Sequence, residues 1–264
     1  MKRYVPLAVA AILVAACSES TSPTATLTPQ DTKSTPPPPI TVAGNLTSDS
    51  YTFEDASITG AGGTGWAEEA VGTSGSIGAE TVATTEAWNN STRFLGRASN
   101  NALFLVVPNG GHTYDLSFDL YTIGSWDGQG KQAQHGAFGQ DIWRLSIRCG
   151  SVSAPASAIL LETDFSNQET VQQSYPDAAS QTGGHKAATG SYGVDLLGFR
   201  NDPTVNTPTF RSYGDVEYHM DFTGVNPCPA DQTTYFTFVV PFGNLQSNYD
   251  ESWGLDNVVI KTDS

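Results

Sequence analysis

The sequence predicts an all-β fold in which two antiparallel sheets pack face to face. Apolar and polar residues alternate with a period of two in several stretches, which is the pattern of a strand with one buried face. Gly, Pro, Asn and Asp separate these stretches, and no stretch keeps a helical period over three turns. Many short strands without helices favour a two-sheet sandwich. Pairing of the first strand with the last would protect its edges.

The alternation places the individual strands. Large apolar residues occupy every second position from Tyr114 to Leu120, and acids or serine stand between them. The predicted strands, in chain order, are 103–107, 114–120, 142–149, 158–165, 216–222, 234–240 and 255–260. The part of the chain from residue 45 to 264 is long enough for one core and suits a single all-β domain.

The first residues have the pattern of an export signal. Lys2 and Arg3 precede an apolar run over residues 4–14, which is too short to remain as a membrane-spanning helix. The end of the run, Leu-Val-Ala-Ala-Cys up to Cys17, resembles a bacterial lipobox. That resemblance implies that residues 1–16 are removed as a lipoprotein signal peptide and that Cys17 carries a diacylglycerol. The alternative is an ordinary signal peptide with an incidental cysteine.

Residues 17–44 are predicted to form a tether. They are mostly Ser, Thr and Pro and end in four consecutive prolines at 36–39. Such a segment has too little apolar surface to offset the entropy of ordering it, and the proline run should be extended. The predicted location is therefore the bacterial cell envelope, at the outer membrane if the host has one, with the lipid as the only membrane contact.

The charge of the chain limits its partners. Removing residues 1–16 takes away two cations and no acid, which changes the net charge from −15 to −17. This balance argues against binding of nucleic acid or of an anionic surface through a basic patch. It is typical of a soluble surface protein or of one that collects cations.

Two further cysteines, Cys149 and Cys228, are predicted to form a disulfide. Thiols outside the cytoplasm tend to oxidise, Cys149 ends a predicted strand, and Cys228 stands between two prolines in a predicted loop. A zinc site is the weaker interpretation, because no pair of histidines at ligand spacing accompanies the two cysteines.

Motifs at both ends of the domain carry a family resemblance. The sequence Tyr-Thr-Phe-Glu-Asp stands at residues 51–55, and Ser-Trp-Gly-Leu-Asp-Asn-Val stands at residues 252–258. These motifs resemble those of jelly-roll domains of the MAM and galactose-binding-like (concanavalin-like) type, and of secreted bacterial domains that end in the same way. The resemblance implies a jelly-roll β-sandwich of two antiparallel sheets over residues 45–264.

The same resemblance implies a calcium site. In such jelly rolls the two ends of the domain meet, so an acid from the opening motif and an acid from the closing motif can share one ion. The matching residues are Glu54 or Asp55 and Asp256, and carboxylates are the ligands that Ca²⁺ prefers. The alternative is that Asp256 accepts hydrogen bonds from backbone N–H groups near a strand end.

Trp126 and Asp127 are the predicted ligand-binding residues. They lie in a turn-rich stretch, Ser-Trp-Asp-Gly-Gln-Gly at 125–130. An aromatic ring beside polar groups can hold the apolar face of a sugar ring. The alternative is that Trp126 packs over the end of a sheet and Asp127 bonds within its own loop.

Catalysis has weaker support in the sequence. Glu162 and Asp164 share one face of a predicted strand and resemble the acids of laminarinase-like sandwiches, but a third acid is missing. The four histidines are isolated, and there is no Gly-x-Ser-x-Gly motif. The sequence therefore favours a non-catalytic module that binds a glycan or a surface protein. A glycoside hydrolase or lyase on a concanavalin-like sandwich is the alternative.

Overall fold

A computed structural model describes residues 47–60, 64–70, 83–108, 111–129, 140–179, 184–202, 213–225, 228–241, 245 and 248–262. The predicted signal peptide at 1–16, the predicted lipidation site Cys17 and the predicted tether up to residue 44 lie outside these residues. Within the described part of the chain, no helix is long and apolar enough to cross a membrane.

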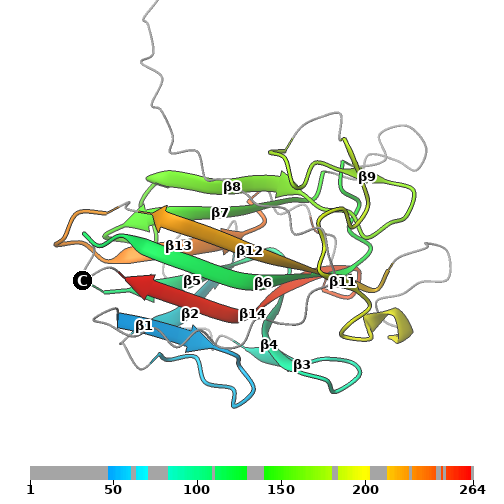
Figure 1. Ribbon diagram of the computed structural model, residues 1–264, viewed down its shortest axis with the longest axis horizontal. Helices are drawn as coiled ribbons and strands as arrows, with labels where there is room; N and C mark the ends of the chain where they lie inside the picture. The colour runs from blue at the N-terminus through cyan, green and yellow to red at the C-terminus, as the bar shows by residue number, and fades with distance from the viewer. Residues whose placement is uncertain are drawn as a thin grey trace, which may run out of the picture.

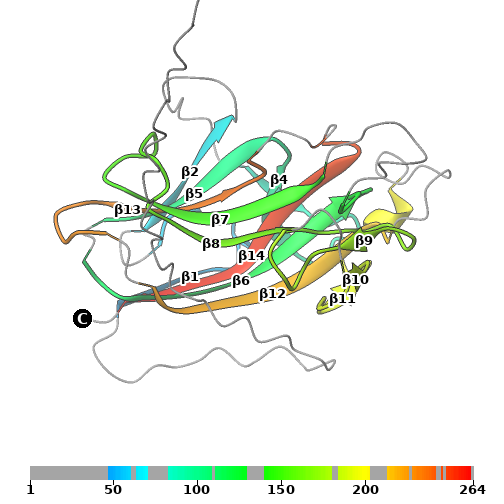
Figure 2. The same ribbon diagram turned by 90° about the horizontal axis from the view of Figure 1, so that it is seen from above.

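Two antiparallel sheets form a sandwich, which confirms the predicted all-β jelly-roll class (Figures 1 and 2). The large sheet contains β11 (Gly193–Val194), β12 (Asp215–Val225), β6 (Tyr114–Gly124), β14 (Glu251–Thr262), β4 (Arg93–Ala98), β3 (Thr84–Glu86) and β1 (Thr47–Tyr51). The small sheet contains β2 (Gly65–Ala70), β5 (Asn101–Val107), β13 (Thr234–Val239), β7 (Ile142–Cys149) and β8 (Ala158–Asp164). A short ribbon of β9 (Gln172–Gln173) and β10 (His185–Lys186) and a 3₁₀ turn, η1 (Phe199–Asn201), complete the described elements.

The last strand, β14, organises the large sheet. It pairs along its length with β6 on one side. On its other side it pairs first with β4 and then with β1, where Tyr51 lies opposite Val258. The predicted pairing of the opening and closing strands is therefore confirmed, and the edge of β14 is covered by both strands in turn.

The core lies between the two sheets and follows the predicted alternation. Leu116, Phe118 and Leu120 of β6 are fully buried, as are the inward-facing residues of β12 and β13. Trp143 of the small sheet lies against Trp253 of the large sheet, with 6.1 Å between ring centroids. Burial of these rings provides the main hydrophobic contribution to the fold.

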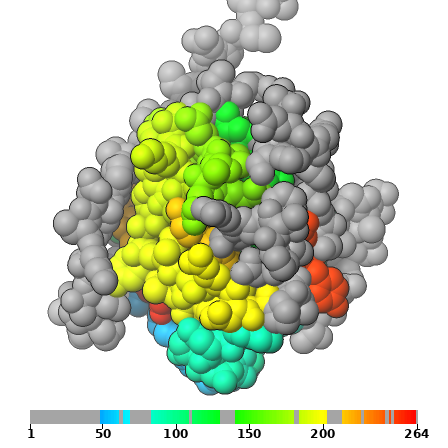
Figure 3. Space-filling model, turned by 90° about the vertical axis from the view of Figure 1, so that its right-hand side faces the viewer, coloured from blue at the N-terminus to red at the C-terminus, as the bar shows by residue number. Residues whose placement is uncertain are grey.

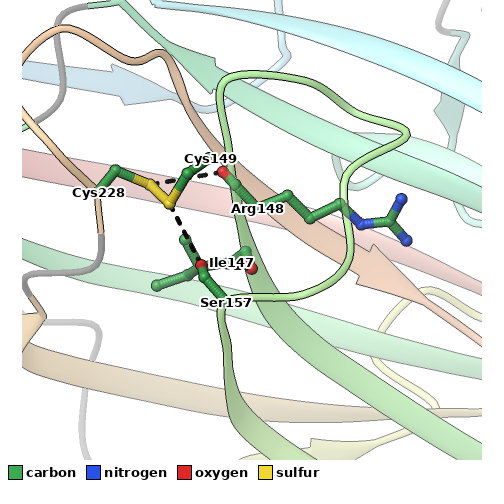
Figure 4. The surroundings of a disulfide bond; sticks show 5 residues. All are labelled: Ile147, Arg148, Cys149, Ser157 and Cys228. Atoms are coloured by element: carbon green, nitrogen blue, oxygen red, sulfur yellow. Dashed lines mark hydrogen bonds between the residues drawn. A yellow bond between two sulfur atoms is a disulfide. The ribbon is translucent and has the colours of Figure 1, made fainter.

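The predicted disulfide is confirmed (Figure 4). Cys149 and Cys228 are bridged over a sequence separation of 79 residues, with 5.4 Å between their Cα atoms. Ser157 Oγ lies 3.3 Å from Cys149 Sγ and donates a hydrogen bond to Ile147 O. The bridge therefore fixes the loop that carries Cys228 to the end of β7.

Candidate functional site on the outer face of the large sheet

The alternation of the strands directs a second set of side chains away from the core. On β6 and β12 the odd-numbered positions face outward, since Phe118, Tyr218 and their even-numbered neighbours fill the core. Pairing of the two strands places His219 opposite Asp119, and Glu217 opposite Tyr121. Directly opposed side chains lie within contact distance.

A bulge in β14 adds two more outward side chains. The register between β14 and β6 shifts between Asp256 and Val259, while Leu255 and Val258 remain fully buried. Asn257 takes the left-handed conformation, with φ 47°, which Asn tolerates better than most residues. The motif Leu-Asp-Asn-Val therefore turns both Asp256 and Asn257 outward, and Asp256 lies opposite Asp119.

These residues form a connected group, which we call the outer polar cluster: Asp119, Tyr121, Glu217, His219, Asp256 and Asn257. Asp119 accepts hydrogen bonds from His219 Nδ1 at 2.6 Å and from Asn257 Nδ2 at 2.7 Å. Asp256 accepts one from the backbone N–H of Asn257 at 2.7 Å and one from the Tyr121 hydroxyl at 3.3 Å. Three neighbouring strands thus contribute to one polar surface.

Glu217 is the least satisfied acid of the cluster. Its residue is 9% exposed, and its carboxyl group has no hydrogen bond to any described residue. Burial raises its pKa to about 8, with further contributions from Asp119, Asp256 and Asp215. At neutral pH this group is mostly a neutral carboxylic acid, which can donate a hydrogen bond as well as accept one.

His219 carries the positive charge of the cluster. Its second nitrogen, Nε2, lies 3.4 Å from Asp221 Oδ2. Hydrogen bonds to Asp119 and Asp221 raise the pKa of His219 to about 10, so both ring nitrogens carry protons at neutral pH. The imidazolium is partly exposed, with 29% of its side-chain surface accessible.

An apolar group and an exposed tryptophan border the cluster. Ala87, Phe94, Ile123, Leu197 and Phe199 pack with Tyr121 on the outer face. Ala87 and Phe94 belong to the β3–β4 hairpin, whereas Leu197 and Phe199 belong to the segment that leads into η1 and to its first residue. The hairpin and this segment adjoin on the face shown in Figure 3. Asn89 N donates to Leu197 O at 3.0 Å, which ties the hairpin turn to that segment. Trp88 in this turn is 49% exposed.

The turn also brings together two of the predicted calcium ligands. The Thr92 hydroxyl donates to Glu54 Oε1 and lies 3.3 Å from Asp256 Oδ2. Burial raises the pKa of Asp256 to about 7, and the charges of Asp119 and Glu54 add to this rise. Glu54, Asp256 and the Thr92 hydroxyl are hard oxygen donors of the kind that Ca²⁺ takes, and they are three of the roughly six to eight oxygens that the ion binds. Asp55 does not join them, because its carboxylate accepts the Ser57 N–H at 2.9 Å within its own turn.

A second acidic group lies at one end of the sandwich, where two loops meet the start of β14. Asp127, Asp141 and Glu251 are each at most 5% exposed, and one carboxylate oxygen from each lies within 4.8 Å of the others. We call these three residues the loop acidic group. Burial raises the pKa of Asp141 well above its usual range, and the charge of Glu251 adds to the effect.

The structure corrects the predicted ligand-binding pair. Trp126 is 0% exposed, and its Nε1 donates to Ser252 O at 2.9 Å. Its ring faces are therefore covered by protein and cannot hold a sugar. Asp127 accepts a hydrogen bond from Gln168 Nε2 within the loops. The alternative interpretation, a packed Trp126 with Asp127 bonded locally, describes the structure.

The acids considered for catalysis have separate structural partners. Glu162 forms an ion pair with Arg144 on the neighbouring strand. Asp164 accepts hydrogen bonds from Gln140 Nε2 and from the Ser174 N–H, each at 2.8 Å. The two carboxylates thus hold β8 to its surroundings.

Sequence reasoning missed most of the outer polar cluster. The alternation that predicted β6 and β12 already marked Asp119, Glu217 and His219 as positions outside the core. It did not show that β6 lies between β12 and β14, and so it could not bring these residues together with Asp256. Trp88 falls outside every predicted strand and carried no signal of its own.

Comparisons with known proteins assign no family. No protein-family model and no curated protein matches the chain. Among solved structures, the chain is similar to the CBM22-1–GH10 modules of an endo-1,4-β-D-xylanase from Clostridium thermocellum, complexed with xylohexaose, at 13% identity and a TM-score of 0.30. The match covers 82% of this chain and 28% of that one.

Proposed function

We propose that the domain is a non-catalytic glycan-binding module, and that the outer polar cluster and Trp88 form its binding surface. The observation that carries the proposal is Glu217, a nearly buried carboxyl group that faces outward and has no hydrogen bond to the described residues. A group of this kind gains a partner when a polar ligand binds. A surface protein is the other ligand class, and the experiment below separates the two.

The chemistry of the cluster suits the hydroxyl groups of a sugar. A hydroxyl both donates and accepts hydrogen bonds. The cluster offers an acceptor in Asp119 and, in protonated Glu217, a group that both donates and accepts. Both N–H groups of His219 already bond to Asp119 and Asp221 and hold the cluster in place. Trp88 adds an exposed ring of the kind that covers the apolar face of a sugar.

The charge of the surface narrows the ligand class. Asp119 and Asp221 flank the cation His219, Asp256 lies opposite Asp119, and the whole chain has a net charge of −15. An anionic glycan would be repelled by this field. The module is therefore expected to bind neutral glycans or glycans that carry amines.

A glycan array tests the proposal, with two variants of the surface and one matched control. Trp88→Ala and Glu217→Ala should reduce the signal for the preferred glycan at least fivefold. Ile159→Ala, a change at an equally exposed apolar side chain on the other sheet (49% for both residues), should leave it unchanged. Absence of binding to any neutral or amine-bearing glycan would refute the proposal, and specific binding to a surface protein instead would favour the other ligand class.

One observation favours an enzyme as the second candidate. Glycoside hydrolases combine a protonated acid with a second carboxylate, and Glu217, whose pKa is raised by burial to about 8, stands diagonally across the strand pair from Asp119. Release of reducing ends from the bound glycan would support this candidate if Glu217→Gln abolishes the release. A glycan that stays intact after prolonged incubation would reject the enzyme candidate and leave glycan binding without hydrolysis.

Calcium bound by Glu54 and Asp256 is part of the proposal. An ion there would remove the repulsion between the two carboxylates and tie the segment after β1 to β14, and it would stabilise the folded state selectively. Millimolar Ca²⁺ should raise the melting temperature of the wild-type protein, and Asp256→Asn should reduce this rise. Asp55→Asn serves as the matched control, because its carboxylate lies in a separate turn. A wild-type melting curve that does not respond to Ca²⁺ or to a chelator would contradict the site.

We further propose that lipid on Cys17 anchors the module to the bacterial envelope. The proposal rests on the lipobox resemblance and the charged, apolar start of the chain. Cys17→Ala should prevent processing and move the protein out of the membrane fraction. A wild-type mature chain without an acyl group in mass spectra would exclude the anchor.

A further inference from the structure

A cavity opens at the edge of the sandwich, and none of its lining residues belongs to the outer polar cluster. It is lined by residues of β2 and β5 from the small sheet and of β3 and β4 from the large sheet. Its volume is about 320 Å³, and Glu68, Arg97, Asn248 and Tyr249 are among its lining residues. This volume is at the lower end of the range for small-molecule sites, about 300–1,000 Å³. We call this cavity the edge pocket.

Arg97 supplies fixed donors to the edge pocket. Its Nε donates to Ser252 Oγ at 3.3 Å, and Nη2 donates to Asn248 O. The guanidinium also lies over the Phe199 ring, 5.1 Å from its centroid. These contacts hold the guanidinium plane in place but use only part of its five N–H groups. The remaining donors are therefore oriented before a ligand arrives.

Glu68 and Tyr249 supply the other two elements of a polar site. Glu68 Oε1 accepts a hydrogen bond from Asn101 Nδ2, and its second oxygen has no hydrogen bond to any residue that the structure describes. Tyr249 is 69% exposed, the largest exposure among the large apolar side chains of the described chain. The pocket thus combines a donor, an acceptor and an accessible aromatic ring.

We propose that the edge pocket binds one neutral sugar ring, such as the end of a glycan chain. Tyr249 covers the apolar face of the ring, and Arg97 and Glu68 bond its hydroxyls. Asp202 Oδ2 lies 3.9 Å from Arg97 Nη1 and already balances the charge of Arg97. Glu68 therefore leaves the pocket with a negative charge, and a neutral ligand suits it better than a uronic acid, whose carboxylate would be repelled. The inference shares the ligand class of the proposed function but concerns a different place on the molecule.

Saturation-transfer NMR on the full chain tests the edge pocket with the methyl glycosides of glucose, galactose, mannose and xylose. At least one of them should show transfer. Tyr249→Ala should weaken its binding about tenfold, which equals about 1.4 kcal/mol, whereas Tyr249→Phe should retain it because the ring remains. Trp88→Ala should leave the transfer that Tyr249→Ala removes, and Ile159→Ala, at an exposed side chain outside both sites, should have no effect. Because Tyr249 is exposed, its replacement by alanine should not disturb folding. An unchanged melting temperature of the Tyr249→Ala variant would show that its weaker binding does not come from misfolding.

Four results would overturn the assignment of sugar binding to the edge pocket. The first is no transfer from any of the four glycosides, and the second is an equal Kd for wild type and Tyr249→Ala. The third is stronger binding of methyl glucuronide than of the neutral glycosides. Loss of binding in Trp88→Ala instead of Tyr249→Ala would also overturn it, but would support glycan binding at the outer polar cluster.

Discussion

The outer polar cluster and the loop acidic group are both sets of nearly buried acids, but they are built differently. In the loop acidic group, Asp141 accepts the backbone N–H of Asp127, and Asp127 accepts the amide of Gln168. In the outer polar cluster, Asp119 and Glu217 stand on paired strands whose backbone groups already bond to each other, whereas Asp256 accepts the N–H of Asn257 at the bulge of β14. Glu217 there serves no backbone donor, and its neighbour His219 is partly exposed.

The difference shows why burial and a raised pKa do not by themselves mark a functional site. Loops leave backbone N–H groups without ladder partners, and buried acids satisfy them. An outward-facing strand has no such need, so an acid there is not required by the backbone. Gly128 illustrates the close fit of the loops, because a Cβ at this residue would lie 2.4 Å from Gln172 O.

Removal of the disulfide should have the largest effect on stability of all the changes considered. Replacing both Cys149 and Cys228 by serine should lower the free energy of unfolding by about 4–5 kcal/mol, because the closed loop is long. It should not change the affinity for the array-selected glycan, since neither cysteine belongs to either acidic group. Urea unfolding of oxidised wild type and the double variant measures the difference. A loss below ~1 kcal/mol would show that the bridge contributes little to the fold.

Asp141→Ala probes the structural role of the loop acidic group. Burial raises the pKa of Asp141, and its carboxyl group accepts the Asp127 N–H, so the change removes this acceptor. The Asp127 N–H then stays buried without its partner, and a small cavity forms. Together these effects should cost about 2–4 kcal/mol.

Asp141→Asn keeps an acceptor of the same shape and should cost less than about 1 kcal/mol. Urea unfolding compares the two variants. An equally large loss for Asn and Ala, reproduced in wild type by a chelator, would instead identify the loop acidic group as a cation site.

Glu217→Gln probes the electrostatic difference between the two groups. Burial and the neighbouring acids raise the pKa of Glu217 to about 8. Between about pH 5 and 8 the folded protein therefore holds a proton that the unfolded chain has lost, and stability falls as the pH rises. The glutamine variant lacks this titration, so its loss of stability between pH 5 and 8 should be smaller by about 1–2 kcal/mol. Parallel profiles for the two proteins would show that Glu217 is ionised in the fold.

The sequence predicted the central strands well because each has a clear alternation of buried and exposed residues. The predicted strand 216–222 lies within β12, and 234–240 corresponds to β13 at Thr234–Val239. Strands β3 and β4 were not predicted. They are short, and the β4 motif Arg-Phe-Leu-Gly-Arg-Ala shows no regular alternation because a register shift occurs opposite it.

The candidate site was less predictable because it depends on sheet order. Asp256 and Glu54 were identified through the end motifs, and the structure connects them through Thr92. Trp126 looked like a surface residue in a polar loop, but its indole fills the core beside Phe165. The local sequence can show that a stretch is a loop. It cannot show whether one residue of that loop is buried, because this depends on which other segments pack against it.

Glycan binding by surface variants tests the central claim most directly. Calorimetry with the glycan selected on the array would compare wild type, Trp88→Ala, Glu217→Ala and Asp141→Asn. The two changes at the outer face should each weaken binding at least fivefold while stability at pH 7 changes little, and Asp141→Asn should leave the affinity unchanged. Equal affinities for wild type and both outer-face variants, or a loss confined to Asp141→Asn, would contradict the assignment of the binding surface to the outer polar cluster.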